Sequence, residues 1–399
     1  MDLASFTWLL TGDGQTLLEV ASRAYADADG DPVRATAAVR RTEPDHERSA
    51  TALTQVGLRV RGVAKFGEDA LRMYFTPDGL EQATRRRVAD HRAARLAAAA
   101  PASVVDLGCG IGGDLLALAR AGIVAAGVDL DPVRVAVAEA NLAALGLEGA
   151  VMVADATTLP LDGFGVALLD PARRDGRGRV FDVDAWTPPW TFVEGLLRRP
   201  AVVKVAPGVP HDLVPDGVEA EWVSERGDVK EAALWSPHLA VARRRATVLG
   251  AHGLATLTEE DDPHDGRPRP LRAVGRYLYE PDGAVIRAGL VTAVAGLVDG
   301  GLVDEKIAYV TSDAAFRTPY ATTYEVLEEL PYREKPLRAA LRERGVGRLT
   351  IKKRGVDVVP EQLRKRLALS GDEEATIVMT RVAGEGTALL VRPVSGPGA

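Results

Sequence analysis

The segment VVDLGCGIGGDLLALARAGIVAAGVDLD, from Val104 to Asp131, decides the fold. It starts with a short apolar run, passes through a glycine-rich turn and an amphipathic stretch, and ends with a second apolar run followed by acids. This pattern predicts a strand, a turn, a helix and a second strand, which together form one unit of a parallel α/β sheet. Because glycine has no Cβ and tolerates positive φ, the turn also allows the backbone to approach a ligand closely.

The spacing of the glycines separates two classes of ligand. Dinucleotide-binding folds carry G-x-G-x-x-G, which seats a pyrophosphate on a helix N-terminus. This chain instead reads D-L-G-C-G-I-G-G-D, so that Asp106 stands two residues before the first glycine. A carboxylate there repels pyrophosphate and attracts a cofactor that bears an amine and a sulfonium cation. The turn therefore favours S-adenosylmethionine.

These residues resemble the first motif of the class I methyltransferases, in which an acid precedes G-x-G-x-G and a second acid, at the end of the next strand, holds the ribose. Asp129 matches that second acid. The resemblance implies that adenine is contacted just after the predicted strand 150–153. The expected cofactor residues are Asp106, Gly108, Gly110 and Gly112 on the methionine side, Asp129 at the ribose, and Asp155 and Ala156 at the adenine.

The methyl acceptor is expected beside "GVALLDPARR", where a buried strand over 166–169 ends in Asp170. The family often places an acid or amide, two prolines and an aromatic residue there; this chain keeps the acid and one proline. We expect Asp170 to accept a hydrogen bond from the acceptor; either base stacking passes to an arginine or to Phe75, or the acceptor is not an adenine. The expected catalytic residues are Asp170, Pro171 and Arg173, with Arg174 and Lys204 as further substrate contacts.

A second stretch, "TPPW" at 187–190, looks like the missing motif but lies about 17 residues too late. We interpret it as the start of a helix, with Thr187 as N-cap and Pro188 as first residue. Further along, "AVVKVAP" at 201–207 predicts a fifth strand, and "AEWVS" and "EAALW" predict a hairpin that turns at Gly227-Asp228. The predicted fold is α/β: a Rossmann-like seven-stranded sheet with a terminal antiparallel hairpin, over residues 99–246.

Composition indicates an enzyme of the cytoplasm. The 399 residues are 46% hydrophobic, enough for two or three cores, and the net charge of −7 argues against general binding of polyanions. A single cysteine, Cys109, excludes an internal disulfide and is expected to be a packed residue. We expect no export signal, no membrane anchor and no metal site, because apolar runs are short and the six histidines show no ligand spacing.

Residues 1–98 are predicted to be helical, ending in one long helix over 79–100. Its basic side is either a solvated face or a surface near the cofactor that meets phosphates; the residues are Arg85, Arg86, Arg87, Arg92 and Arg95. The preceding "MYFTPDG" resembles the "FSVTPE" segment of the trimethylguanosine synthases, which contributes to their active site. That similarity implies that Phe75, Thr76 and Pro77 lie near the cleft.

The carboxy-terminal part carries the strongest local charge. Residues 247–330 are predicted to be a connecting region with mixed α/β structure, including a strand at 276–279 and one helix through 298. Residues 331–399 then predict a small α+β domain. Its segment 335–366 has eleven basic and three acidic residues, which indicates nucleic-acid binding unless acids elsewhere neutralise it. The expected contacts are Lys352, Lys353 and Arg354.

Taken together, the helical start, the glycine-turn core and the basic "TIKKRG" tail resemble the bacterial THUMP-like-domain methyltransferases over most of the chain. The resemblance implies an S-adenosylmethionine-dependent methyltransferase acting on a base in structured RNA such as tRNA or rRNA. Two alternatives stay open: a small-molecule methyltransferase whose basic tail serves dimerisation, and an RNA-binding protein that keeps the cofactor without turnover. The sequence does not indicate the RNA species, the acceptor atom or the oligomeric state.

Overall fold

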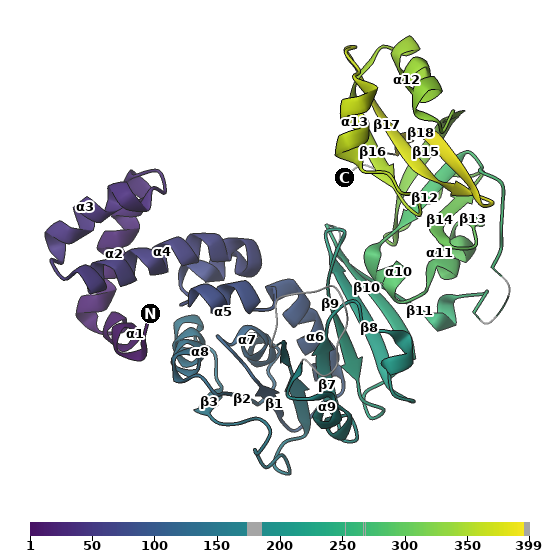
Figure 1. The fold of residues 1–399 in the computed structure, drawn as a ribbon. Coiled ribbons are helices and arrows are strands. Elements are labelled where there is room, and N and C mark those ends of the chain that lie inside the picture. Colours follow the sequence, from purple (N-terminus) through teal and green to yellow (C-terminus); the bar gives the residue numbers. More distant parts are fainter. Residues whose placement is uncertain (174–185, 252, 266, 268, 395–399) are drawn as a thin grey trace. The chain divides into compact units, whose positions relative to one another are not determined.

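The computed structural model describes residues 1–173, 186–251, 253–265, 267 and 269–394. The chain forms two compact units (Figure 1). The first comprises Met1–Val205, Pro210–Val218 and Ala233–Ala240, and the second comprises Ala206–Val209, Glu219–Ala232 and Val241–Ala399. Arg174 belongs to the residues outside this description, so its predicted role stays a prediction.

The chain begins with helices, as expected. Each of the first four starts at a side chain that accepts a backbone N–H bond, which satisfies donors that a helix start leaves unpaired. Those N-caps are Asp2, Thr11, Asp31 and Asp45. The helices are α1 (Leu3–Leu9), α2 (Gly12–Asp27), α3 (Pro32–Thr42) and α4 (His46–Phe66), followed by a short 3₁₀ helix (Gly67–Leu71).

The single helix predicted over 79–100 is wrong: the chain forms α5 (Pro77–Gln82) and α6 (Arg86–Ala98), with an extended break between them. The cause is a tertiary contact. Lys65 of α4 donates its Nζ to the carbonyls of Leu80, Glu81 and Ala83, at 2.5–3.0 Å, and so satisfies acceptors at the end of α5. A helical pattern in the sequence cannot reveal a cap that comes from another helix.

The parallel sheet follows the predicted plan. β1 pairs with β2 and with β4, β2 pairs with β3, and β4 pairs with β7, all parallel. The order in which the strands are added to the sheet therefore reverses between β1 and β4, and open α/β sheets bind ligands at such a point. The strands are β1 (Val104–Leu107), β2 (Ala125–Asp129), β3 (Ala150–Val153), β4 (Val166–Leu169) and β7 (Ala201–Val205); the helices are α7 (Gly113–Arg120), α8 (Pro132–Leu145) and α9 (Trp190–Leu196).

The predicted hairpin is β8 (Glu219–Glu225) and β9 (Asp228–Trp235). Its turn is Arg226-Gly227, one residue earlier than predicted, with φ of 53° and 85° as tight hairpin turns require. In the described part of the chain the sheet has nine strands rather than seven, because β10 (Arg244–Gly250) and β11 (Gly253–Thr258) extend it. The strand order is β11-β10-β8-β9-β7-β4-β1-β2-β3. The predicted domain end at residue 246 thus falls inside β10.

The second unit contains a seven-stranded sheet in the order β13-β14-β12-β15-β18-β17-β16. The helix predicted through 298 is two short helices, α10 (Gly283–Arg287) and α11 (Val291–Leu297), separated at Gly289 with φ of 69°. Its strands are β12 (Tyr277–Pro281), β13 (Gly301–Asp304), β14 (Ile307–Ser312), β15 (Ala321–Leu330), β16 (Val346–Lys353), β17 (Glu373–Val382) and β18 (Glu385–Pro393). The helices α12 (Glu334–Glu343) and α13 (Pro360–Leu367) both pack on β16.

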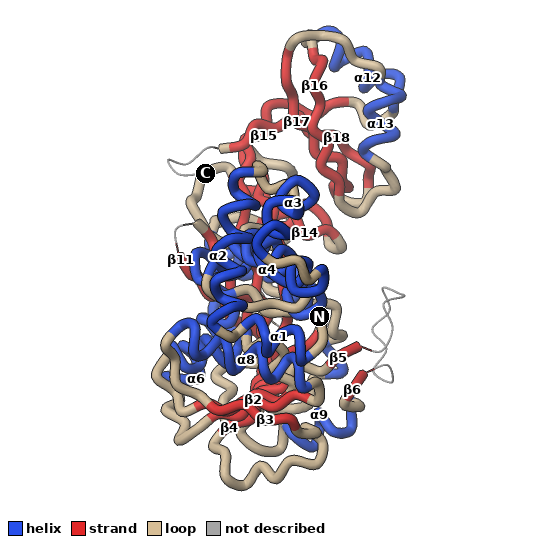
Figure 2. Tube along the Cα trace, turned by 90° about the vertical axis from the view of Figure 1, so that its left-hand side faces the viewer, coloured by secondary structure: helices blue, strands red, loops and turns tan. Residues whose placement is uncertain are grey.

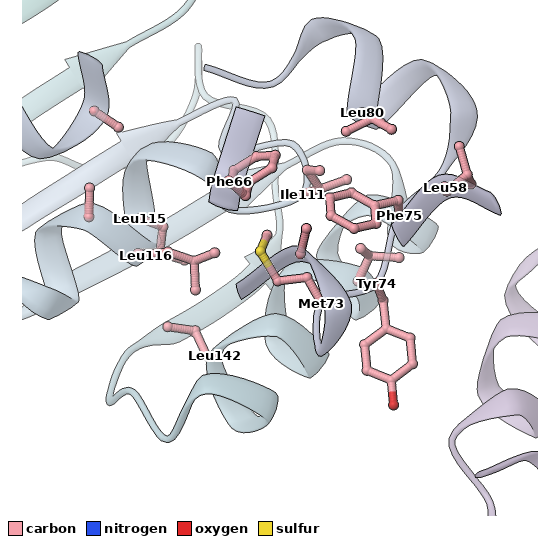
Figure 3. Close-up of a cluster of buried hydrophobic side chains, with 14 of the residues drawn as sticks. Leu58, Phe66, Met73, Tyr74, Phe75, Leu80, Ile111, Leu115, Leu116 and Leu142 are labelled. Carbon is pink, nitrogen blue, oxygen red and sulfur yellow. The ribbon is translucent and has the colours of Figure 1, made fainter. Parts of the chain in front are cut away.

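The core of the first unit joins the segment 73–80 to the glycine turn. Phe75 and Met73 are fully buried and pack in one apolar cluster with Ile111 of the turn and with Leu115 and Leu116 of α7 (Figure 3). Asn141 of α8 reinforces this junction, since its Oδ1 accepts from the Tyr74 N–H at 2.6 Å and its Nδ2 donates to the carbonyls of Tyr74 and Ile111. The segment before α5 is therefore held against the turn.

Candidate functional site

A cavity of about 390 Å³ lies at the carboxyl edge of β1 and β4. Its walls include five of the predicted site residues: Asp106, Gly108, Gly110, Asp170 and Pro171. The glycine turn and the end of β4 meet there because the two strands are neighbours in the sheet. The structure thus brings the expected cofactor turn and the expected acceptor residues to one cavity.

The glycine turn has the backbone conformation that its sequence predicted. Gly108, Gly110 and Gly112 have φ of 84°, 56° and 90°, a region that residues with a Cβ rarely adopt. A Cβ at Gly110 would meet no atom within 4 Å, although Gly110 lines the cavity. The space in front of the turn is therefore available to a ligand, and a side chain there would occupy it.

Asp129 is the last residue of β2, and two backbone N–H groups hold its carboxylate beside the glycine turn. Its Oδ2 accepts from the Gly110 N–H at 3.0 Å, and its Oδ1 accepts from the Asp131 N–H at 2.9 Å. Each oxygen keeps a further lone pair, which is what a carboxylate needs to receive two vicinal hydroxyls. Asp129 is therefore in a position that suits the predicted ribose contact.

Asp106 is a buried carboxylate of the site, with 2% of its surface exposed. Its pKa is raised to about 7, mainly by burial; the Lys204 ammonium opposes this shift and the nearby Asp170 carboxylate adds to it. A bound cation stabilises the ionised form of this carboxylate, because its charge offsets the free-energy cost of ionising a buried group. The donor set of the cavity, which combines carboxylates with an open glycine turn, fits a cofactor that carries positive charge.

Lys204, the residue before the last of β7, is buried in a network of charges. Its Nζ forms an ion pair with Asp170 and bonds to Thr84 Oγ1 at 2.5 Å and to Asp114 Oδ2 at 3.3 Å. Asp114 is held in turn by Arg92 of α6, which is also buried. The Lys204 ammonium therefore has three partners inside the protein, and it fixes the Asp170 carboxylate at the cavity wall.

One wall of the cavity was not predicted from the sequence. Gly79 and Gln82 of α5, Thr84, Asp114 and Arg134 also line it. Gln82 accepts a hydrogen bond from Arg134 of α8 at 3.2 Å, which links the two helices. The "TPDG" start of α5 was the available signal: Thr76 caps the helix by accepting from the Gly79 N–H at 3.0 Å, and a Cβ at Gly79 would lie 2.5 Å from Ile111.

Several predicted residues do not line the cavity, and Phe75, Asp155 and Ala156 are among them. Phe75 is fully buried between Phe66 and the turn, so its ring packs in the core and cannot stack on a base in this conformation. Asp155 is exposed and accepts from the N–H and hydroxyl of Thr157 at 2.8 and 2.7 Å. Neither Asp155 nor Ala156 lines the cavity. Their contact with adenine stays a prediction.

The "TPPW" stretch lies beside the predicted acceptor residues. Ala172–Arg173 form β5, and they pair antiparallel with Trp186–Thr187, which form β6 (Figure 2). The helix N-cap is Pro189 rather than Thr187, so the interpretation of this stretch as a helix start was two residues early. The backbone of Arg173 pairs with that of Trp186.

The arginines before the sheet make contacts within the protein. Arg86 pairs with Asp69 at 2.9 Å and with Asp90 at 3.3 Å, Arg92 pairs with Asp114, and Arg95 lies 3.7 Å from the Trp235 ring centroid. Cys109 is buried, and burial raises its pKa well above the usual range, as expected of a packed thiol. Among the residues described, no cluster of acids, histidines or cysteines has the arrangement of a metal site, and no helix is long and apolar enough to span a bilayer.

The basic triplet of the second unit is divided between two faces of β16. Lys352 bonds to Glu280 at 2.6 Å, and Arg354 lies 3.8 Å from the same carboxylate. Although partial burial opposes it, the bond to Glu280 raises the Lys352 pKa. Lys353 is exposed and pairs with no carboxylate of the described chain. The wider segment 321–393 holds 14 basic and 11 acidic residues, so its net charge is only +3.

Comparisons with known proteins agree with this geometry. Family models match residues 104–169 as a methyltransferase domain, residues 321–393 as a THUMP domain-like module, and residues 2–62 as a domain of unknown function. An uncharacterized S-adenosylmethionine-dependent methyltransferase, found in two strains of Mycobacterium tuberculosis, is 38% identical over 84% of this chain and 95% of its own length. A crystal structure of a proposed methyltransferase from Porphyromonas gingivalis has a TM-score of 0.73 at 20% identity, covering 96% of this chain and 99% of that one, which shows the same fold. The chain therefore belongs to the class I S-adenosylmethionine-dependent methyltransferases with a THUMP-like domain.

Proposed function

We propose that this enzyme methylates a base in structured RNA, with Asp170 facing the acceptor. The observation that carries the proposal is the meeting of Asp106, the glycine turn and the Lys204-bound Asp170 around one cavity, in a chain that also has a THUMP-like module. The module supports RNA as the substrate, since the free cations that it exposes suit phosphates.

The proposed mechanism assigns binding, orientation and hydrogen bonding to the residues of the cavity. S-adenosylmethionine supplies the methyl group. The glycine turn and Asp106 would hold its methionine part and Asp129 its ribose, while Asp155 and Ala156 would contact the adenine. Asp170 would accept a hydrogen bond from the acceptor amine or ring nitrogen, which fixes the attacking atom in line and excludes water. The Lys204 ammonium, which pairs with Asp170, would hold this carboxylate in place as a hydrogen-bond acceptor, and the proton lost by the methylated nitrogen would pass to solvent.

Within the THUMP-like module, ion pairs indicate which cations are available to RNA. Leu349 and Ile351 of β16 pack with α12 and α13, so Lys353, two residues further on, lies on the same face of the strand. Lys335 of α12 and Lys365 of α13 are exposed and, like Lys353, pair with no carboxylate in the described chain. We propose that these three lysines, on the helix side of the sheet, contact RNA phosphates. Lys352 and Arg354 are already engaged by Glu280.

Replacing Lys335 and Lys365 with Gln should weaken RNA binding about tenfold and lower the salt slope of log K by about 2, because two phosphate contacts are lost. The matched control removes two arginines of the same module, Arg348→Gln and Arg364→Gln, which pair with Glu374 and Glu361. Fluorescence anisotropy of labelled total tRNA at several salt concentrations measures both. An equal loss in the two variants would contradict the assignment of the helix side.

The affinity for S-adenosylmethionine should rise as the pH rises through about 7 and level off above it. The reason is that a cationic ligand favours the ionised form of Asp106, whose pKa is raised to about 7 by burial, so that binding expels its proton. Below that pH the affinity should fall by up to about tenfold per pH unit. Isothermal titration calorimetry between pH 5.5 and 8.5 measures the profile. Asp106→Asn should flatten it; a variant that keeps the same profile would assign the titration to another group.

The decisive experiment is mass spectrometry of nucleosides from the total RNA of a deletion strain beside its parent. A modified nucleoside that is missing only in the deletion strain, and that returns when the wild-type gene is restored, identifies the product. Unchanged profiles of tRNA and rRNA would favour the alternative, a small-molecule methyltransferase. In that case, the affinity for RNA should also not depend on salt.

A further inference from the structure

A second cavity, of about 680 Å³, lies in the first unit between the amino-terminal helices and α8. Arg23 of α2, Arg59 of α4 and Arg72 line it, and Glu19 is the single carboxylate among its lining residues. Its apolar wall includes Tyr74, whose hydroxyl points away from the core cluster (Figure 3). The cavity is therefore net positive and has a volume in the range of small-ligand sites.

Arg59 is held in place without a counter-charge. Its Nε donates to the Met73 carbonyl at 2.9 Å, its Nη2 to the Arg72 carbonyl at 3.4 Å, and its guanidinium lies 4.9 Å from the Tyr74 ring centroid. No carboxylate in the described part of the chain pairs with Arg59 or with Arg23. Burial lowers the Arg59 pKa, with only partial compensation from Tyr74, which is the signature of a cation lacking an anion. Arg72 is exposed and, within the described residues, pairs only with Asp69, which Arg86 and Arg120 also hold.

We propose that this cavity binds a phosphate group of a nucleotide. A planar guanidinium matches phosphate in two-bond geometry, and a fixed Arg59 loses little conformational freedom when it binds. The apolar wall, with Leu18, Leu71 and Ala144, provides the surface on which the nucleoside part rests. The phosphate comes either on an RNA strand or on a free nucleotide. Only the first source rests on the function proposed above.

The cavity borders the same short segment as the cofactor site. Tyr74 lines the arginine cavity, Asn141 ties its backbone to Ile111 of the glycine turn, and α5 begins three residues later. An RNA strand bound at the arginine cavity would therefore be anchored next to the element that forms one wall of the methyl-transfer cavity. This places the helical region among the substrate-binding parts of the enzyme.

The test uses the full chain with saturating S-adenosylhomocysteine, so that the cofactor site is closed to nucleosides. The probes are UMP, uridine, inorganic phosphate and a labelled single-stranded RNA of 12 nucleotides. The variant Arg23→Gln/Arg72→Gln removes two exposed cations and should fold normally. The matched control is Arg40→Gln, an exposed arginine in the last turn of α3 that does not line the cavity.

We expect the double variant to lose about tenfold in affinity for the phosphate-bearing probe, since charge-assisted bonds to phosphate are lost. Arg40→Gln should stay within about twofold, as distant surface charges are screened. If the double variant loses affinity for UMP, a free nucleotide is sufficient for binding. If it loses affinity for RNA alone, the phosphate comes from an RNA strand. The proposal is overturned if the double variant binds every probe as tightly as the wild type does, or if UMP binds the wild type and uridine binds it equally tightly. If the double variant binds every probe like the wild type and still methylates RNA, this inference fails while the function proposed above stands.

Discussion

Asp170→Asn should lower the rate of methyl transfer about 10²- to 10³-fold and leave cofactor affinity within a few-fold of wild type. The substitution keeps the shape of the side chain but removes the charge that Lys204 holds toward the cavity. It also removes the carboxylate that raises the Asp106 pKa, so that cofactor binding at neutral pH should not weaken. Single-turnover transfer from labelled S-adenosylmethionine to RNA of the deletion strain measures the rate, and calorimetry measures the affinity.

The matched control for this prediction is Asp162→Asn, an exposed carboxylate of the same unit that does not line the cavity. It should retain both the transfer rate and the cofactor affinity. If Asp170→Asn transfers methyl groups at the wild-type rate, Asp170 does not contact the acceptor. If it loses the cofactor together with the activity, Asp170 belongs to the cofactor site instead.

Lys204→Met should destabilise the first unit by about 3–5 kcal/mol, because removing one partner of a buried charge network leaves the others unpaired. The side chains of Lys204 and Asp114 are 8% and 9% exposed, so water offers the carboxylate little compensation. For a unit of this size the melting temperature should fall by about 10 °C. Thermal unfolding followed by circular dichroism measures the shift.

Two further variants test the cause of that loss. Lys204→Met combined with Asp170→Asn should recover part of the stability, since one of the stranded carboxylates is then neutral. Lys230→Met is the surface control, because Lys230 pairs with an exposed Asp228 and such pairs contribute little. Equal destabilisation by Lys204→Met and Lys230→Met would mean that the buried network contributes no more to stability than an exposed ion pair.

Local patterns were sufficient for the elements around the glycine turn. The predicted strands 150–153 and 166–169 coincide with β3 and β4. Caps, apolar runs and turn glycines act over a few residues, which is why the sequence displays them. The helix predicted over 79–100 failed because Lys65, from another helix, ends α5. β10 and β11 were missed because the sequence between 244 and 258 lacks a motif that marks added edge strands.

The sequence by itself determined the chemistry of the pocket: carboxylates beside a glycine turn suit a cationic methyl donor, and the comparisons place the chain among the S-adenosylmethionine-dependent methyltransferases. Only the tertiary structure decided which charged side chains are paired within the protein. Lys204 meets Thr84 and Asp114, which lie 120 and 90 residues away along the chain, so a predicted substrate contact is bound within the protein. Glu280 likewise engages Lys352 and Arg354 across 72 and 74 residues and leaves Lys353 exposed. Ion pairing depends on distance in space, and a count of charges along the chain contains no distances.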